Sequence, residues 1–335
     1  MNKTVQTVLT VFCALMILTL PFLVPSPKLL ESAVDRILEE APAEADEAGS
    51  LLDWLFGTAK AEEEGPAYSL PVDLTPGYEP NPTCYTENGY EDDSITVQME
   101  TVEDDGVLYC IARVTVKSPT QLRTASAGSL KSRKYARISS MAAKNNAIVA
   151  INGDNFANDP QKTTYEYRMG QQIRAKTNRK KDILIIDENG DFHLFVKSDK
   201  EKLAAFEKSG LQIVNAFTFG PALVIDGEVQ SIDKSYGYNP GGKEPRMAIG
   251  QTGTLSYILV MAEGRNKNSE GVTQQEMADF MGELGCVQAF NLDGGNSAEM
   301  IFNNAFYGSR TGNERDQSDI IYFATAVDPA EWKGQ

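Results

Sequence analysis

Five short polar segments of this chain carry side chains that could bind or transform a ligand. In one of them, Asp293 stands at the mouth of a tight turn, and Gly294 and Gly295 let backbone N–H groups approach a ligand. One such turn is weak evidence, because turns often use Asp, Asn and Gly. Five segments that all come just after apolar strands favour a shared site, since loops at strand ends commonly hold ligands. The segments are NGDNF (152–156), Gly220-Pro221, EPRMAIG (244–250), EGR (263–265) and NLDGGNS (291–297).

The scarcity of histidine and cysteine limits other chemistries. The single histidine, His193, excludes a zinc site built on several histidines, and any Ser-His-Asp triad would have to use it. The four cysteines form no CxxC metal motif, and Cys84 and Cys110 are candidates for a disulfide outside the cell. The formal net charge of −16 disfavours nucleic acid as a partner, because phosphate affinity comes from Lys and Arg.

Alternating apolar and polar residues predict the elements that would position these segments. Residues 95–116 and 181–196 have the pattern of β-hairpins. Residues 271–286 predict a helix that Thr273 and Glu276 begin with a capping box. A second helix is expected at 133–146, and strand-forming segments at 147–153, 221–230, 253–264, 287–295 and 318–327. Because strands outnumber helices, we expect a mixed α/β fold, with a mainly antiparallel sheet and a few packed helices.

The N-terminal part of the chain has a different composition. Residues 8–24 are apolar and uncharged and follow Lys3, which predicts a signal-anchor, with a cleaved signal peptide and secretion as the alternative. Lys3 favours a cytoplasmic N-terminus and an extracytoplasmic body. Residues 27–105 hold 21 of the 47 acidic residues, which indicates a solvated stalk. We therefore expect a membrane segment at 1–26, an acidic, proline-containing stalk at 27–93 and a single catalytic domain at 94–330.

Several motifs of the body together carry a family resemblance. They are AIVAINGDNF, FTFGPALVIDG, RMAIGQ, the run GVTQQEMADFMGELGCVQAFNLDGGNSAEM and the closing SDIIYFAT. With them the chain resembles the phosphodiester glycosidase family over roughly residues 95–327, most specifically from Gly264 to Ser297. The chain departs from the family's pattern at Asn296, where a third glycine is usual, and at Asp154, where glycine is frequent.

The resemblance implies hydrolysis of the bond between a sugar anomeric carbon and a phosphate oxygen. It makes Asp293 the leading catalytic carboxylate, with Asp154 and Glu263 as further candidates. Arg246 and Arg265 would clamp the phosphate, since guanidinium offers it paired donors, unless each pairs with a nearby acid. The residues expected to contact the substrate are Asn152, Gly153, Gly220, Asn291, Gly294, Gly295 and Ser297.

Two other functions stay open at this point. The chain could be a non-catalytic glycan-binding or exopolysaccharide assembly factor, or a metal-dependent phosphodiesterase that cleaves the P–O bond. Asp154, Asp293 and neighbouring carbonyls could hold calcium or magnesium, but their spacing matches no known loop, so neither a metal nor another cofactor is predicted. The expected partners are a carbohydrate–phosphate substrate of the cell envelope and, through the anchor, a membrane. The sequence does not set the oligomeric state.

Overall fold

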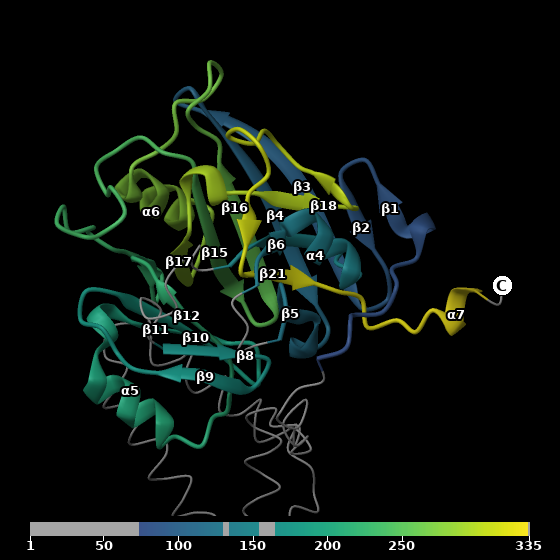
Figure 1. Ribbon diagram of the computed structural model, residues 1–335, viewed down its shortest axis with the longest axis horizontal. Coiled ribbons are helices and arrows are strands. Elements are labelled where there is room, and N and C mark those ends of the chain that lie inside the picture. Colours follow the sequence, from purple (N-terminus) through teal and green to yellow (C-terminus); the bar gives the residue numbers. More distant parts are fainter. Residues whose placement is uncertain (1–73, 130–133, 154–164, 334–335) are drawn as a thin grey trace, which may run out of the picture. The chain divides into compact units, whose positions relative to one another are not determined.

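The structure is a computed structural model that describes residues 74–129, 134–153 and 165–333. These residues form three larger β-sheets around one shared hydrophobic core (Figure 1). All strand pairs within the sheets are antiparallel in the described residues. The prediction of an antiparallel fold with few helices is therefore confirmed, although the strands divide among several sheets instead of one.

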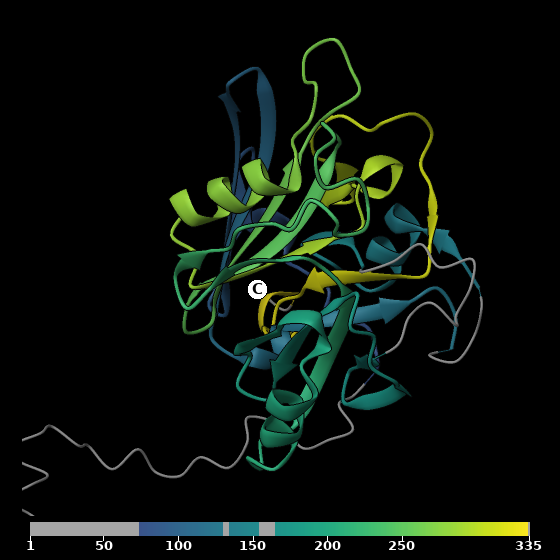
Figure 2. The same cartoon turned by 90° about the vertical axis from the view of Figure 1, so that its left-hand side faces the viewer.

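The largest sheet has nine strands and contains most of the predicted hairpins. Its order is β1 (Tyr85–Thr86), β2 (Gly89–Glu91), β3 (Ile95–Asp104), β4 (Val107–Val116), β16 (Ser256–Ala262), β15 (Arg246–Gly253), β17 (Gln288–Leu292), β13 (Ala222–Ile225) and β14 (Glu228–Val229). Helix α6 (Gln274–Glu283) covers its outer face and buries Met277, Ala278 and Met281 there (Figure 2). The opposite face looks into the shared core.

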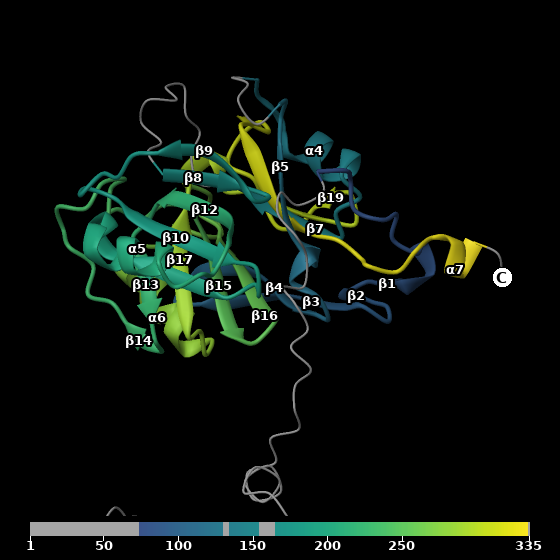
Figure 3. The same cartoon turned by 90° about the horizontal axis from the view of Figure 1, so that it is seen from below.

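The other two larger sheets have five strands each, and each also carries a helix on its outer face. One has the order β19 (Ala305–Phe306), β18 (Met300–Phe302), β7 (Val149–Asn152), β21 (Asp319–Phe323), β5 (Leu122–Ser126), and is covered by α4 (Ile138–Lys144). The other has the order β11 (Phe192–Phe195), β10 (Asp182–Asp187), β12 (Ile213–Phe219), β8 (Tyr165–Arg168), β9 (Gln171–Ala175), and is covered by α5 (Lys200–Glu207) (Figure 3). The remaining elements are the strand pair β6 (Ala136–Arg137) and β20 (Asp316–Gln317), the 3₁₀ turns η1 (Pro82–Cys84), η2 (Pro119–Gln121), η3 (Val196–Ser198) and η4 (Gly295–Ser297), and α7 (Ala330–Lys333).

Local sequence signals explain several of these elements. Asp105 and Gly106 both have positive φ, 44° and 74°, as a tight hairpin turn between β3 and β4 requires. Thr273 caps α6 by accepting from the N–H of Glu276, whose carboxylate accepts in return from the N–H of Thr273. Both predictions from the sequence are thereby confirmed.

Some expectations differ from the structure. The helix expected at 133–146 begins only at Ile138, because Ala136 and Arg137 pair as strand β6. The segment 244–250 was expected to follow a strand, but most of it is the start of β15. The β-structure of the body begins at Tyr85, ahead of the expected boundary at residue 94.

Two further expectations concern the cysteines and the membrane. Cys84, Cys110 and Cys286 are free thiols, so the candidate disulfide is not formed. No helix within the described part of the chain has the length and apolar character needed to cross a bilayer. The apolar run at 8–24 lies outside the described residues, as does Cys13.

Candidate active site

The Asp-Gly-Gly turn lies where two sheets meet. Asp293 directly follows β17 of the nine-stranded sheet, and Asn152 ends β7 of a five-stranded sheet. The buried amide of Asn152 donates to the carbonyl of Asp293 at 2.9 Å and to that of Gly153 at 3.0 Å. Its Oδ1 accepts from the N–H of Glu299 at 3.3 Å. Asn152 therefore joins the ends of both strands and fixes the backbone on which the Asp293 carboxylate stands.

Arg265 faces the same turn from the loop after β16. A Cβ atom on Gly295 would lie 3.4 Å from both terminal guanidinium nitrogens, so the glycine leaves the guanidinium close to the turn's backbone. Arg265 donates from Nε to Glu244 at 2.5 Å and from Nη1 to Oδ1 of Asn296 at 2.8 Å. Its side chain is 44% exposed. The bond from Arg265 also lowers the pKa of Glu244. The structure thus holds a partly exposed cation beside the Asp293 turn.

Arg246 occupies a different environment. Its side chain is buried, and four of its N–H groups donate to main-chain carbonyls of the neighbouring loops. Burial lowers its pKa to about 10. The accepting carbonyls belong to Val272, Tyr238, Asn239 and Gly242. Because these carbonyls use most of its donors, the geometry favours Arg265 over Arg246 as a phosphate clamp.

Glu263 is also held by the protein. Its Oε1 accepts from the N–H of Ser309 at 2.6 Å, and its Oε2 accepts from the amide of Asn266 at 3.4 Å. The side chain is 4% exposed. These contacts tie two loops together, and they do not direct Glu263 toward the Asp293 turn.

The remaining expected site residues lie around the end of β17. Buried Asn291 donates to the carbonyl of Gly220 at 2.8 Å, while its Oδ1 has no hydrogen-bond partner in the described residues. Ser297 is buried and accepts from Nη1 of Arg315 at 3.3 Å. A side chain on Gly294 would come within 2.6 Å of the Pro245 carbonyl, so this position needs glycine. Asp154 lies outside the described residues.

The sequence did not draw attention to a buried ion pair beneath this region. Nε of Arg168 donates to Oδ2 of Asp319 at 2.7 Å, and the two side chains are 1% and 4% exposed. The Asp319 carboxylate lies against Gly153, where any side chain would collide with it. Arg168 also donates to the carbonyls of Tyr167 and Ala216. The sequence signal was a charged residue at one end of each of two strands, Arg168 in β8 and Asp319 in the wholly buried β21.

Glu299 was missed as well. It is 1% exposed, its Oε1 accepts from the N–H of Arg315 at 3.4 Å, and its Oε2 has no partner in the described residues. Burial raises its pKa from 4.5 to about 7, although the hydrogen bond from the N–H of Arg315 acts in the opposite direction. The N–H of Glu299 also donates to Oδ1 of Asn152. Asn152 therefore links this buried acid to the Asp293 turn.

Replacing Glu299 by glutamine should stabilise the protein at pH 8 and leave its stability at pH 4.5 nearly unchanged. The folded state binds the proton of Glu299 more tightly than the unfolded state, so wild-type stability falls as pH rises between 4.5 and about 7. The uncharged amide avoids this loss, which amounts to about 3 kcal/mol. Urea unfolding of the wild type and the variant at both pH values measures the difference in their free energies of unfolding. An equal difference between variant and wild type at both values would contradict the assignment.

The described residues show no preformed metal centre. Within 74–129, 134–153 and 165–333, no three Asp, Glu, Cys or His side chains lie close enough together to hold an ion. Asp154, one of the two carboxylates considered for such a site, is outside these ranges.

Comparisons with known proteins identify similar sequences and a similar fold. The SPbeta prophage-derived uncharacterized protein YomE of Bacillus subtilis (strain 168) is 24% identical over 186 residues, which cover 54% of this chain but only 28% of that protein. The chain therefore spans less than a third of this relative. The fold is similar to that of a zebrafish N-acetylglucosamine-1-phosphodiester alpha-N-acetylglucosaminidase catalytic domain auto-inhibited by pro-peptide, with a TM-score of 0.54 and 15% identity over 74% of this chain and 87% of that one.

The family assignment rests on the sequence that contains the site. Residues 145–324 match the family described as phosphodiester glycosidase. This range covers more than half of the chain and includes β7, β17, Arg265 and the Asp293 turn. The chain belongs to the phosphodiester glycosidase family.

Proposed function

We propose that this protein hydrolyses the glycosidic C–O bond of a sugar-1-phosphate diester. The observation that carries the proposal is the placement of the Arg265 guanidinium against Gly295, two residues after Asp293. A cation that faces a turn carrying a carboxylate suits a substrate whose reacting carbon becomes positive while its leaving group becomes negative.

The proposed chemistry divides between these two side chains. Water adds to the anomeric carbon while the bond from that carbon to the phosphate oxygen breaks, and the phosphate monoester leaves with the bonding electrons. Arg265 stabilises the charge on the departing phosphate, which is a weak base and needs little protonation. Asp293 stabilises the oxocarbenium-like transition state, as a nucleophile or as the base that takes the proton of water.

The proposed setting is the cell envelope. The apolar run at 8–24 and the acidic stretch that follows it support a tethered body outside the cytoplasm. The substrate would then be a phosphodiester-linked surface glycan. Cell fractionation followed by protease treatment of intact cells tests this, since a cytoplasmic body would be protected from the protease.

The position of bond cleavage tests the proposed reaction. The full chain is incubated with an N-acetylglucosamine-phosphate diester in water labelled with oxygen-18. Label in the released sugar is the expected result, because water attacks carbon. Label in the phosphate would show P–O cleavage and replace the proposal with a phosphodiesterase. Sugar binding without turnover of any diester would favour a glycan-binding role.

A further inference from the structure

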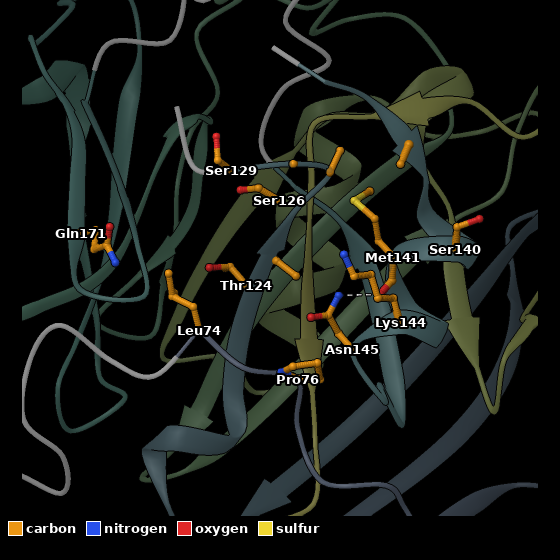
Figure 4. A pocket seen from close by; sticks show the side chains of 14 residues that line it. Leu74, Pro76, Thr124, Ser126, Ser129, Ser140, Met141, Lys144, Asn145 and Gln171 are labelled. Atoms are coloured by element: carbon orange, nitrogen blue, oxygen red, sulfur yellow. Dashed lines mark hydrogen bonds between the residues drawn. The ribbon is translucent and has the colours of Figure 1, made fainter. Parts of the chain in front are cut away.

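A cavity of about 650 Å³ opens between helix α4 and the outer edge of strand β5 (Figure 4). Its lining contains no aspartate or glutamate and one basic residue, Lys144. The polar side chains around it are Thr124, Ser126, Ser129, Ser140, Asn145 and Gln171. Small residues, among them Ala125, Ala127 and Gly128, leave it wide, while Leu74, Pro76 and Met141 supply apolar surface.

Many of these polar groups have no protein partner. Five of the lining side chains make no hydrogen bond or ion pair within the described part of the chain. They are Ser126, Ser129, Ser140, Lys144 and Gln171. Water satisfies these groups in the free protein, since Ser129, Ser140 and Lys144 are exposed, and a polar ligand can replace that water. Hydroxyls and amides beside apolar surface match a polyhydroxylated molecule, which has both C–H and O–H faces. The lone lysine, with no carboxylate nearby, favours a ligand that also carries negative charge.

The edge of β5 adds main-chain groups to this surface. Ala127 donates to the carbonyl of Ser318 at 2.8 Å, and Ala324 donates to that of Gln121 at 3.1 Å. Odd-numbered residues of this strand therefore bond to β21, and the N–H and C=O groups of Thr124 and Ser126 point outward. The N–H of Thr124 meets only Sδ of Met169, at 3.4 Å. The groups of Ser126 are thus available to a ligand.

The end of β5 that borders the cavity lies near the candidate site in the same sheet. Ser126 stands opposite Asp319 on β21, and the next residue of β21, Ile320, stands opposite Asn152 on β7. Two strand spacings separate Ser126 from Asn152, about 10 Å. One molecule a few sugar or polyol units long can span that distance.

We propose that this cavity is a subsite for the second arm of the diester, and that this arm is an anionic chain of sugars or polyols joined by phosphate. This inference rests on the proposed function and names its substrate class. The anomeric sugar would occupy the Asp293 turn, and the arm beyond the phosphate would run along β5, with Lys144 attracting a later phosphate of the chain.

Two diesters that share the same N-acetylglucosamine-1-phosphate test the subsite. One carries a methyl group as its second arm and the other a glycerol-phosphate trimer. Wild-type full chain should show a KM about 10-fold lower for the trimer, and Lys144→Gln should remove this preference without changing the methyl diester's kinetics. Lys208→Gln, an exposed lysine next to α5, is the matched control and should keep the preference.

The outcomes separate the subsite from the proposed reaction. Equal KM values for the two diesters in the wild type, or an unchanged preference in Lys144→Gln, would overturn the subsite and leave the reaction intact. If wild type hydrolyses neither diester, the reaction fails, and titration calorimetry with the free glycerol-phosphate trimer decides the subsite. Binding that Lys144→Gln and Ser126→Leu both weaken supports it, and no binding to the wild type overturns it.

Discussion

Asp293→Asn should lower kcat for a sugar-phosphate diester by about 10²–10⁴-fold, because the amide can act neither as a nucleophile nor as a base. The substitution keeps the size of the side chain. The main-chain carbonyl of residue 293 would still accept from Asn152, so the turn should keep its shape. Steady-state kinetics on the full chain, with the folded state checked by circular dichroism, measure the effect.

Arg265→Met separates the roles of the two side chains. It should reduce turnover of the diester, whose departing phosphate becomes more negative, far more than it reduces binding of the neutral sugar. Glu244→Gln is the matched control, because it weakens the partner of Arg265 but leaves the guanidinium in place.

A near-wild-type kcat in Asp293→Asn would exclude the Asp293 carboxylate from the reaction. Asp154 would then be the next carboxylate to test.

Arg168→Met should destabilise the folded protein by about 3–5 kcal/mol, because it leaves the Asp319 carboxylate buried without its cation. Both side chains are almost wholly buried, so water cannot replace the lost partner. The melting temperature should fall by about 10 °C in a domain of this size. Thermal unfolding followed by circular dichroism measures the shift.

A surface ion pair provides the comparison. Arg113 and Glu100 are 2.9 Å apart, with side chains that are 40% and 44% exposed. Arg113→Met should change stability by less than about 1 kcal/mol. A loss in Arg168→Met no greater than this would show that the buried pair contributes little. Adding Asp319→Asn to Arg168→Met should recover part of the loss, since it removes the isolated charge.

The elements that the sequence predicted well depend on neighbouring residues. The turn at Asp105-Gly106 and the cap at Thr273 are local, and both formed as expected. The division into three sheets depends on pairings between distant segments, which periodicity does not encode. Strand β15 was missed as a strand because it is buried over most of its length and shows no alternation.

In the candidate site, too, some features could be predicted from neighbouring residues and others arise only from the fold. The turn with Asp293, Gly294 and Gly295 could be recognised because these residue types in succession are typical of a tight turn. The Arg168–Asp319 pair joins residues 151 positions apart, so only the fold brings them together. Arg246 shows that residue type alone does not reveal the partners of a side chain, since its guanidinium donates to main-chain carbonyls in the fold.

The position of β21 has a consequence for the order in which the chain can fold. This strand lies between β7 and β5, yet it comes far later in the chain than either, at Asp319–Phe323. The early strands β5 and β7 must therefore wait until β21 has been synthesised before their sheet can close, which is a slow, non-local step. Until then Asp319 cannot reach Arg168, so the ion pair beneath Gly153 forms late.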